Sequence, residues 1–152
     1  MSALPSLGRR PLLLAAGLLC LQTRPASAVS ATLSLQQMVD RWAEGQPVRE
    51  GKISLEIAEL VENGNAVPIT VRVDSAMNAT DRVQEIIVFN ERNPQRDVLR
   101  ASFGPACGRA ELSTRIRLAT SQQLVALARF ADGSQWSHRV DVIVTLAACI
   151  ES

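Results

Sequence analysis

The sequence predicts an all-β protein, an antiparallel β-sandwich of about seven strands with a short N-terminal helix. Three observations predict this fold. From residue 51 onward, apolar side chains recur at every second position, as they do in half-buried strands. No helical pattern interrupts these runs, which favours a sandwich over an alternating α/β fold. Turn signals separate several of the runs, at Asn63-Gly64, Asn93-Pro94, Gly104-Pro105 and Asp132-Gly133.

The mature chain is expected to begin with a helix over residues 34–44. Ser34 can cap this helix, and Gln37 stands at the reciprocal position of a capping box. Gly45 supplies a stop. One face carries apolar residues at helical spacing, namely Leu35, Met38, Val39 and Trp42. Such a stripe predicts a packing face, laid against a sheet or a partner.

The expected strands follow in order along the chain. Asp132-Gly133 lies between two apolar runs and is a good hairpin candidate. No repeat, low-complexity segment or linker divides the mature chain, so residues 29–152 are expected to form one domain. The strands are predicted at residues 53–57, 67–73, 83–89, 99–103, 112–118, 124–130 and 140–146.

Residues 1–28 have the features of a signal peptide. Arg9-Arg10 precedes an apolar stretch, and Ala26-Ser27-Ala28 offers a small-x-small cleavage site, so the mature chain would begin at Val29. The paired arginines favour the twin-arginine export route, with a general secretory signal as the alternative. Cys20 invites a lipoprotein interpretation, but the bulky Leu19 before it disfavours one.

The charge of the mature chain gives no reason to expect nucleic acid or membrane binding. Removing residues 1–28 leaves 13 basic and 15 acidic residues, a net charge of −2. A nearly neutral domain lacks the basic surface that attracts nucleic acid or anionic lipid. No later stretch is long and apolar enough to span a membrane.

The sequence carries few residues suited to catalysis. His138 is the only histidine, and a catalytic triad or a zinc site needs more than one histidine in a strand, so a satisfied strand residue is the expected role. Arg115 and Arg117 share a strand face and could hold an anion, although a solvated face or a subunit contact is the more ordinary role. We therefore predict a protein that is not an enzyme and has no catalytic residues, cofactor or metal site.

Two cysteines remain after the leader, Cys107 and Cys149. Cys149 lies three residues from the C-terminus, after the last expected strand, where it is better placed to be presented to another molecule than to pack in a core. Cys107 lies in an expected loop and could be a buried apolar residue, an exposed thiol or a partner for Cys149. An exported compartment permits a disulfide between them, and the spacing does not decide it.

The order of several segments resembles the SoxY family. Residues 58–69 (AELVENGNAVPI) resemble its AE-NG-VP segment, and residues 114–122 (TRIRLATSQ) resemble its TRIRLA-SQ segment. Asn93-Pro94, the Ala131-to-Ser134 turn and the terminal cysteine complete the same order over roughly residues 35–149.

The resemblance implies an immunoglobulin-like sandwich that acts in the periplasm as the substrate-carrying subunit of thiosulfate oxidation. It implies a SoxZ-like partner in a heterodimer and transient contacts with other Sox proteins. It also implies that Cys149 holds small sulfur compounds covalently, through S-sulfonate or persulfide states. The resemblance assigns no role to Cys107, which is a candidate secondary thiol by residue type alone. A carrier needs an exchangeable sulfur and reach rather than its own acid–base residues.

The arm departs from the family pattern, in which glycines flank the cysteine. Here Ala147 and Ala148 precede Cys149, and Ile150 and Glu151 follow it. Alanine lacks the freedom of glycine, so a stiffer arm is expected, and the Glu151 carboxylate disfavours the thiolate. Two alternatives therefore stand beside the carrier: a SoxY-like binding module of another periplasmic oxidation system, and an unrelated exported sandwich.

Overall fold

The computed structural model describes residues 33–146, which belong to one compact unit. The predicted leader, residues 1–28, and Cys149 lie outside the described residues. The elements are α1 (Leu35–Ala43), β1 (Val48–Glu50), β2 (Ile53–Glu56), β3 (Leu60–Val61), β4 (Val67–Val73), β5 (Val83–Asn90), β6 (Asp97–Ser102), β7 (Glu111–Ile116), β8 (Gln122–Phe130) and β9 (Gln135–Val144).

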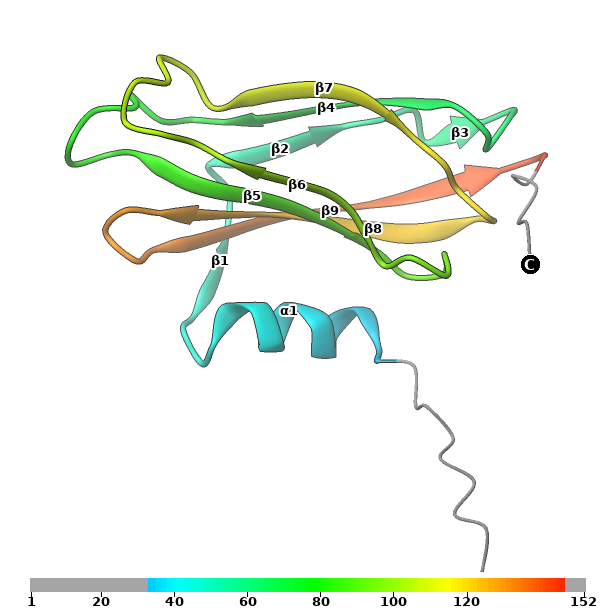
Figure 1. Ribbon diagram of the computed structural model, residues 1–152. Coiled ribbons are helices and arrows are strands. Elements are labelled where there is room, and N and C mark those ends of the chain that lie inside the picture. Colours follow the sequence, from blue (N-terminus) through cyan, green and yellow to red (C-terminus); the bar gives the residue numbers. More distant parts are fainter. Residues whose placement is uncertain (1–32, 147–152) are drawn as a thin grey trace, which may run out of the picture. The chain divides into compact units, whose positions relative to one another are not determined.

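The strands form two sheets that face each other (Figure 1). The larger sheet has the order β1-β9-β8-β5-β6, and β3 also pairs with β9. The smaller sheet has the order β2-β4-β7. The pairs along β9-β8-β5-β6 and within the smaller sheet are antiparallel, whereas β1 and β3 run parallel to β9. The predicted β-sandwich with a short N-terminal helix is confirmed.

The core lies between the two sheets, where the alternating apolar positions of the sequence meet. Along β4 every second residue is buried while Pro68 and Arg72 are exposed, which is the period-two pattern of a strand with one solvated face. β5 and β8 are apolar on both sides because they lie in the middle of the larger sheet, between the smaller sheet and α1. The side chains of Val71, Val83, Ile86, Leu118, Leu124 and Phe130 are among the most completely buried.

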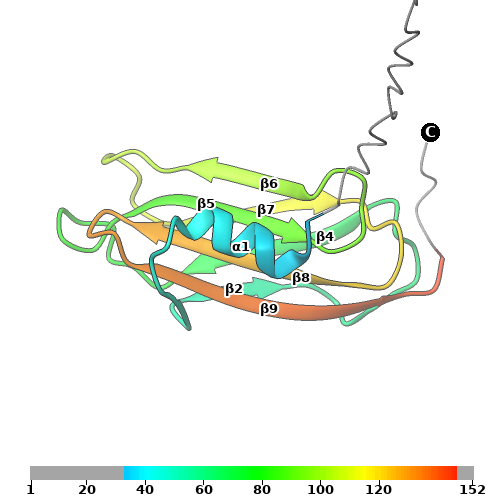
Figure 2. The same ribbon diagram turned by 90° about the horizontal axis from the view of Figure 1, so that it is seen from below.

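Helix α1 packs on the outer face of the larger sheet (Figure 2). The capping box is present: the Ser34 hydroxyl accepts from the Gln37 backbone N–H at 3.1 Å, and Gln37 Oε1 accepts from the Ser34 N–H at 2.8 Å. The helix ends at Ala43 because Glu44, with φ 54°, adopts the left-handed conformation ahead of Gly45. The buried stripe of α1 packs against Ile87, Phe89, Val125 and Leu127.

The structure has two short strands more than the sequence analysis expected, because β1 and β3 are only three and two residues long. Neither is long enough to show an alternating pattern, and both exist because β9 offers an edge to pair with. β9 also begins at Gln135, five residues earlier than the predicted strand. The first half of β9 shows no apolar alternation in the sequence, because it contains the polar residues Gln135, Ser137, His138 and Arg139. Gln135 and Ser137 are nevertheless buried against neighbouring elements.

Candidate functional site

Hydrogen bonds hold the backbone just after β9, three residues before Cys149 in the sequence. The C=O of Leu146, the last described residue, accepts a hydrogen bond from Gly64 N at 2.9 Å. The C=O of Gly64 in turn accepts from Leu118 N at 2.8 Å. One glycine therefore joins the end of β9 to the β3–β4 turn and to the β7–β8 loop.

Two further contacts fix the same stretch of backbone. The N–H of Thr145 donates to Val61 O at 3.0 Å, and the N–H of Val144 donates to the Ser121 hydroxyl at 2.9 Å. The chain is thus held on both sides up to Leu146. The sequence analysis identified Asn63-Gly64 as a turn but missed its role as an anchor, which depends on long-range backbone pairing.

A polar network holds the loops that surround this end of the sandwich. Asn93 Oδ1 accepts from Ala119 N at 3.0 Å and from Gln122 Nε2 at 2.7 Å, while Asn93 Nδ2 donates to Arg117 O at 2.7 Å. Gln122 is 5% exposed, and its Oε1 accepts from Arg92 N at 2.8 Å. Because the buried polar atoms of this network find partners, the β5–β6 and β7–β8 loops are fixed in relation to each other.

Three large apolar side chains are exposed at the same end: Leu60 at 59%, Ile143 at 60% and Leu146 at 61%. We call them the exposed apolar cluster. Leu60 and Ile143 are directly paired across β3 and β9, and Leu146 follows three residues after Ile143. No other large hydrophobic among the described residues is comparably exposed, so the cluster marks this end of the molecule.

Cys107 lies at the opposite end of the sandwich, in the β6–β7 loop (Figure 1). It is half-buried, packs against the core and forms no disulfide with another described residue. The loop starts at Phe103, whose N–H donates to Gln84 O near the start of β5. The start of β5 pairs with the end of β8, which is also where β9 begins. The Cys107 loop therefore lies near the start of β9.

The Cys107 loop lies far from Leu146, the last described residue before Cys149. The 10 residues of β9 separate the level of the Cys107 loop from the end of the described backbone by about 30 Å. From Leu146, the chain reaches at most about 10 Å to Cys149 at ~3.3–3.6 Å per residue. A disulfide requires Cα atoms within about 7 Å of each other. We therefore predict that Cys107 and Cys149 do not pair within one molecule.

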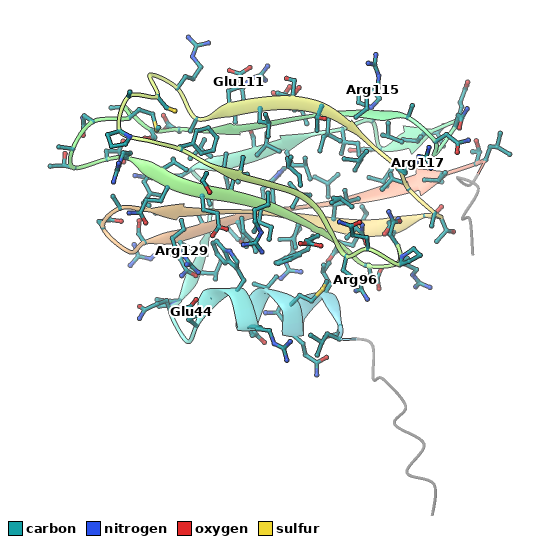
Figure 3. All side chains as sticks on the ribbon, viewed as in Figure 1. Glu44, Arg96, Glu111, Arg115, Arg117 and Arg129 are labelled. Atoms are coloured by element: carbon teal, nitrogen blue, oxygen red, sulfur yellow. The ribbon has the colours of Figure 1, made fainter. Side chains whose placement is uncertain are left out.

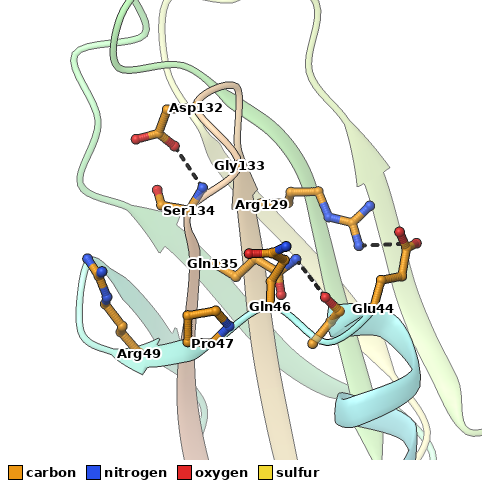
Figure 4. A pocket seen from close by; sticks show the side chains of 10 residues that line it. Glu44, Gln46, Pro47, Arg49, Arg129, Asp132, Gly133, Ser134 and Gln135 are labelled. Carbon is orange, nitrogen blue, oxygen red and sulfur yellow. Dashed lines mark hydrogen bonds and ion pairs between the residues drawn. The ribbon is translucent and has the colours of Figure 1, made fainter.

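A concave region lies between the end of α1 and the β8–β9 hairpin, with a volume of about 570 Å³ (Figure 4). Arg129 Nη2 donates to Trp42 O at 2.5 Å, and Gln135 Nε2 donates to Ala43 O at 3.3 Å. These carbonyls are at the C-terminal end of α1, where a positive charge is favourable. Arg129 also stacks over the Trp42 ring, 4.6 Å from its centroid. We interpret these polar groups as the attachment of α1 to the sheet.

Asp132, at the tip of the hairpin, has a lowered pKa. Hydrogen bonds from Ser134, first from its side chain and then from its backbone, hold the pKa of the Asp132 carboxyl below its ordinary value of 3.8. The Ser134 N–H lies 2.8 Å from Asp132 Oδ1. This is the arrangement of an Asx turn, and it explains why Gly133, with φ 84°, follows.

The other candidate residues have structural or solvated positions. His138 Nδ1 accepts a hydrogen bond from the Leu55 N–H, as expected for a satisfied strand residue. Arg115 and Arg117 are both exposed (Figure 3), and neither forms an ion pair with another described residue. Between residues 33 and 146, no group of three or more His, Cys, Asp and Glu side chains is placed to hold a metal ion.

The described residues define a β-sandwich domain whose last strand precedes the sequence segment that contains Cys149. The family model for sulfur oxidation protein SoxY matches residues 40–149. The chain therefore belongs to the SoxY family. The match ends at Cys149 itself, so the terminal cysteine falls inside the family region.

Solved structures share the fold. The sulfur carrier protein SoxY from Chlorobium limicola f thiosulfatophilum aligns with a TM-score of 0.62 and 24% identity, over 74% of this chain and 97% of that chain. A superoxide reductase (neelaredoxin) from Ignicoccus hospitalis aligns with a TM-score of 0.55 and 17% identity, over 62% of this chain and 80% of that one. At these identities the likeness concerns the fold alone. No curated protein sequence matches the chain.

A structure of a putative superoxide reductase from Thermotoga maritima gives a similar result, with a TM-score of 0.53 and 20% identity over 60% of this chain and 84% of that one. The same sandwich thus appears in proteins whose names differ, and the functional argument has to come from the family and the site. Over the described part of the chain, no helix is long and apolar enough to cross a membrane.

Proposed function

We propose that the protein is a carrier that holds sulfur intermediates covalently on Cys149 during thiosulfate oxidation. The observation that carries this proposal is that the SoxY family match spans the sandwich and ends at residue 149. The anchored end of β9 supports it, because hydrogen bonds to Gly64 and Val61 hold the backbone three residues before the cysteine. A sulfur presented at a fixed place on a rigid scaffold suits successive reactions with several enzymes.

The chemistry asked of Cys149 is exchange at sulfur. In loading, the thiolate and the outer sulfur of thiosulfate form an S–S bond, and the two electrons released pass to a redox partner protein. The product is a cysteine S-thiosulfonate, from which other enzymes remove the sulfonate as sulfate. Such exchange requires an accessible thiolate, and general acid–base residues on the carrier are not required.

The proposal includes export and a partner. Residues 1–28 would act as a signal peptide of the twin-arginine type, and residues 29–152 would work in the periplasm. There the domain would pair with a SoxZ-like subunit and meet other Sox proteins transiently. N-terminal sequencing of the exported protein, with Val29 as the expected first residue, tests the leader.

Reaction with tetrathionate tests the carrier role without an added oxidant. A cysteine thiolate attacks tetrathionate, keeps one S-thiosulfonate group and releases thiosulfate, so atoms and electrons balance within the two reactants. Intact-mass measurement of the mature protein is expected to show one such group. The group should disappear in Cys149→Ser and persist in the matched control Cys107→Ser.

Protein isolated from thiosulfate-grown cells provides the decisive measurement. Sulfur adducts on Cys149 are expected in that material. An adduct-free and unreactive Cys149 would instead favour the alternative of a SoxY-like binding module in another periplasmic oxidation system, for which the loss of the flanking glycines, replaced by Ala147 and Ala148, is the supporting observation.

A further inference from the structure

The outer edge of β9 has a gap between its two short parallel neighbours. β1 pairs with Gln135 to Ser137, and β3 pairs with Ile143 and Val144. Between them the chain leaves the larger sheet to form β2, which pairs with β4 in the smaller sheet. The middle of β9, residues 138–142, therefore pairs with β8 on one side and with no strand on the other. On that open side β2 lies across a groove, and its Leu55 N–H donates to His138 Nδ1 at 3.0 Å.

The register identifies which backbone groups face this gap. Ser137 O accepts from Gly51 N, and Ile143 N donates to Glu59 O, so both residues direct their backbone groups to the outer edge. Groups alternate along a strand, and Arg139 and Asp141 consequently point the same way. Their two N–H and two C=O groups have no backbone partner among the described residues.

A groove of about 680 Å³ lies along the gap, between the edges of β2 and β9. Leu55, Ile57, Val140 and Ile143 provide its apolar surface, and the last of these belongs to the exposed apolar cluster. An exposed run of unpaired backbone groups beside apolar side chains is the arrangement that accepts an added strand.

The charges of the groove define the complementary segment. Its acidic residues are Glu56, Glu59 and Asp141, and Glu56 is paired with Arg72. The one basic residue, Arg139, is turned aside, because its guanidinium donates to Gln123 at 3.2 Å and to Gln36 at 2.6 Å. Asp141 is turned the same way, because its Oδ1 accepts from Gln123 Nε2 at 3.0 Å. Glu59 forms no ion pair with another described residue, so it gives the groove a negative charge.

We propose that the gap in β9 is the docking site for an extended segment of the partner subunit, which adds as a short strand between β1 and β3. The segment would bond to the backbone of Arg139 and Asp141, place apolar side chains on the exposed apolar cluster and carry a basic residue beside Glu59. This inference rests on the proposed function, since it concerns the partner of the same carrier.

The test measures binding of the SoxZ-like subunit to the mature protein and to edge variants. Asp141→Pro removes an outward N–H that makes no bond to β8, and it should weaken binding by about tenfold. The matched control is Ser102→Pro on the open edge of β6. The N–H of Phe103 points inward, because it donates to Gln84 O, so the N–H of the preceding residue, Ser102, points outward. This control should bind within about twofold of the parent.

A second variant keeps the test valid if proline disturbs β9. Ile143→Lys replaces an exposed side chain, removes the apolar contact and opposes the basic residue of the segment, so binding should weaken by a similar factor. Thr114→Lys, at an exposed position of β7, is its control. Amide hydrogen exchange adds a direct readout: Arg139 and Asp141 should become protected in the complex, while Arg100 and Ser102 should not.

The outcomes are distinguishable. If the wild-type chain binds the SoxZ-like subunit and all four variants bind equally well, the inference is wrong and the proposed partner stands. If the wild-type chain does not bind that subunit, both are wrong. If Asp141→Pro and Ile143→Lys abolish self-association instead, the occupant is a second copy of this chain, which also overturns the inference.

Discussion

His138 Nδ1 accepts a hydrogen bond from the backbone N–H of Leu55 at 3.0 Å. The two residues belong to different sheets, since His138 is on β9 and Leu55 is on β2. The imidazole therefore carries its proton on Nε2 and satisfies an edge N–H of the smaller sheet. The single histidine of the chain is a link between the two layers of the sandwich.

Removing this acceptor should destabilise the protein by a modest amount. We expect His138→Leu to lower the free energy of unfolding by about 1 kcal/mol, because the Leu55 N–H loses its partner. His138→Asn places an oxygen near the former Nδ1 and should recover part of the loss. Denaturant unfolding checks both variants, and equal stability of His138→Leu and the parent would contradict the role assigned to this bond.

The attachment of α1 predicts a much larger effect at Trp42. This side chain is 7% exposed, and its Nε1 donates to Glu85 Oε2 at 3.1 Å. Trp42→Ala should cost about 3–5 kcal/mol of unfolding free energy, as is typical of a large buried aromatic residue. Asp40→Ala, on the exposed face of the same helix, is the control and should change stability little.

The hairpin predicts a pH effect confined to acid. The folded-state pKa of Asp132 is lowered, so its contribution to stability is present above the ordinary value of 3.8 and is lost as the pH falls through the folded value. Ser134→Ala should raise the pKa of the Asp132 carboxyl towards 3.8, because the Ser134 side chain is the first cause of the shift. NMR titration of the carboxyl carbon measures it, and an unchanged pKa in the variant would contradict this assignment.

The separation of the cysteines predicts that they do not form an intramolecular disulfide. Under oxidising conditions the monomer should yield no peptide that links Cys107 to Cys149, because about 30 Å of β9 separates their ends of the sandwich. Peptide mapping without reduction tests this, with dimers removed beforehand. Finding the linked peptide in monomer would show that the arm does not start where the described backbone ends.

The flanking alanines predict slow modification of Cys149. Replacing Ala147 and Ala148 by glycine should speed its reaction with a neutral thiosulfonate reagent by about two- to fivefold, given the lower conformational restriction of glycine. Stopped-flow measurement at fixed pH checks the rate, and Cys107→Ser provides the background for the second thiol. An unchanged rate would remove stiffness as the reason for slower loading.

The sequence was sufficient for the elements whose pattern is local. The period-two run of β4 and the capping box of Ser34 and Gln37 depend on neighbouring residues, and they appear in the structure where they were expected. β7 ends at Ile116, two residues before the end of the predicted strand, and Thr114 is exposed. β1 and β3 could not be predicted, because each exists only through parallel pairing with β9.

The candidate site also has one part that the sequence could predict and another part that depends on the fold. The position of Cys149 after the last strand could be predicted from the order of motifs in the sequence. The anchoring of Leu146 by Gly64, and the distance between Cys107 and the arm, depend on how distant segments meet. The family match includes residue 149, and the carrier role of Cys149 stays a prediction for the adduct measurement to test.

Gly64 forms two backbone hydrogen bonds, one to Leu146 and one to Leu118. These bonds would limit how deeply a carrier cysteine on this chain could enter an enzyme. With the backbone held at Leu146, the sulfur of Cys149 can enter another protein only to a depth of about 10 Å. The reacting groups of the enzymes that act on such a carrier must therefore lie close to the enzyme surface, at the bottom of shallow openings. If Cys149 carries sulfur as we propose, an enzyme with a long, narrow channel is expected not to receive its cargo.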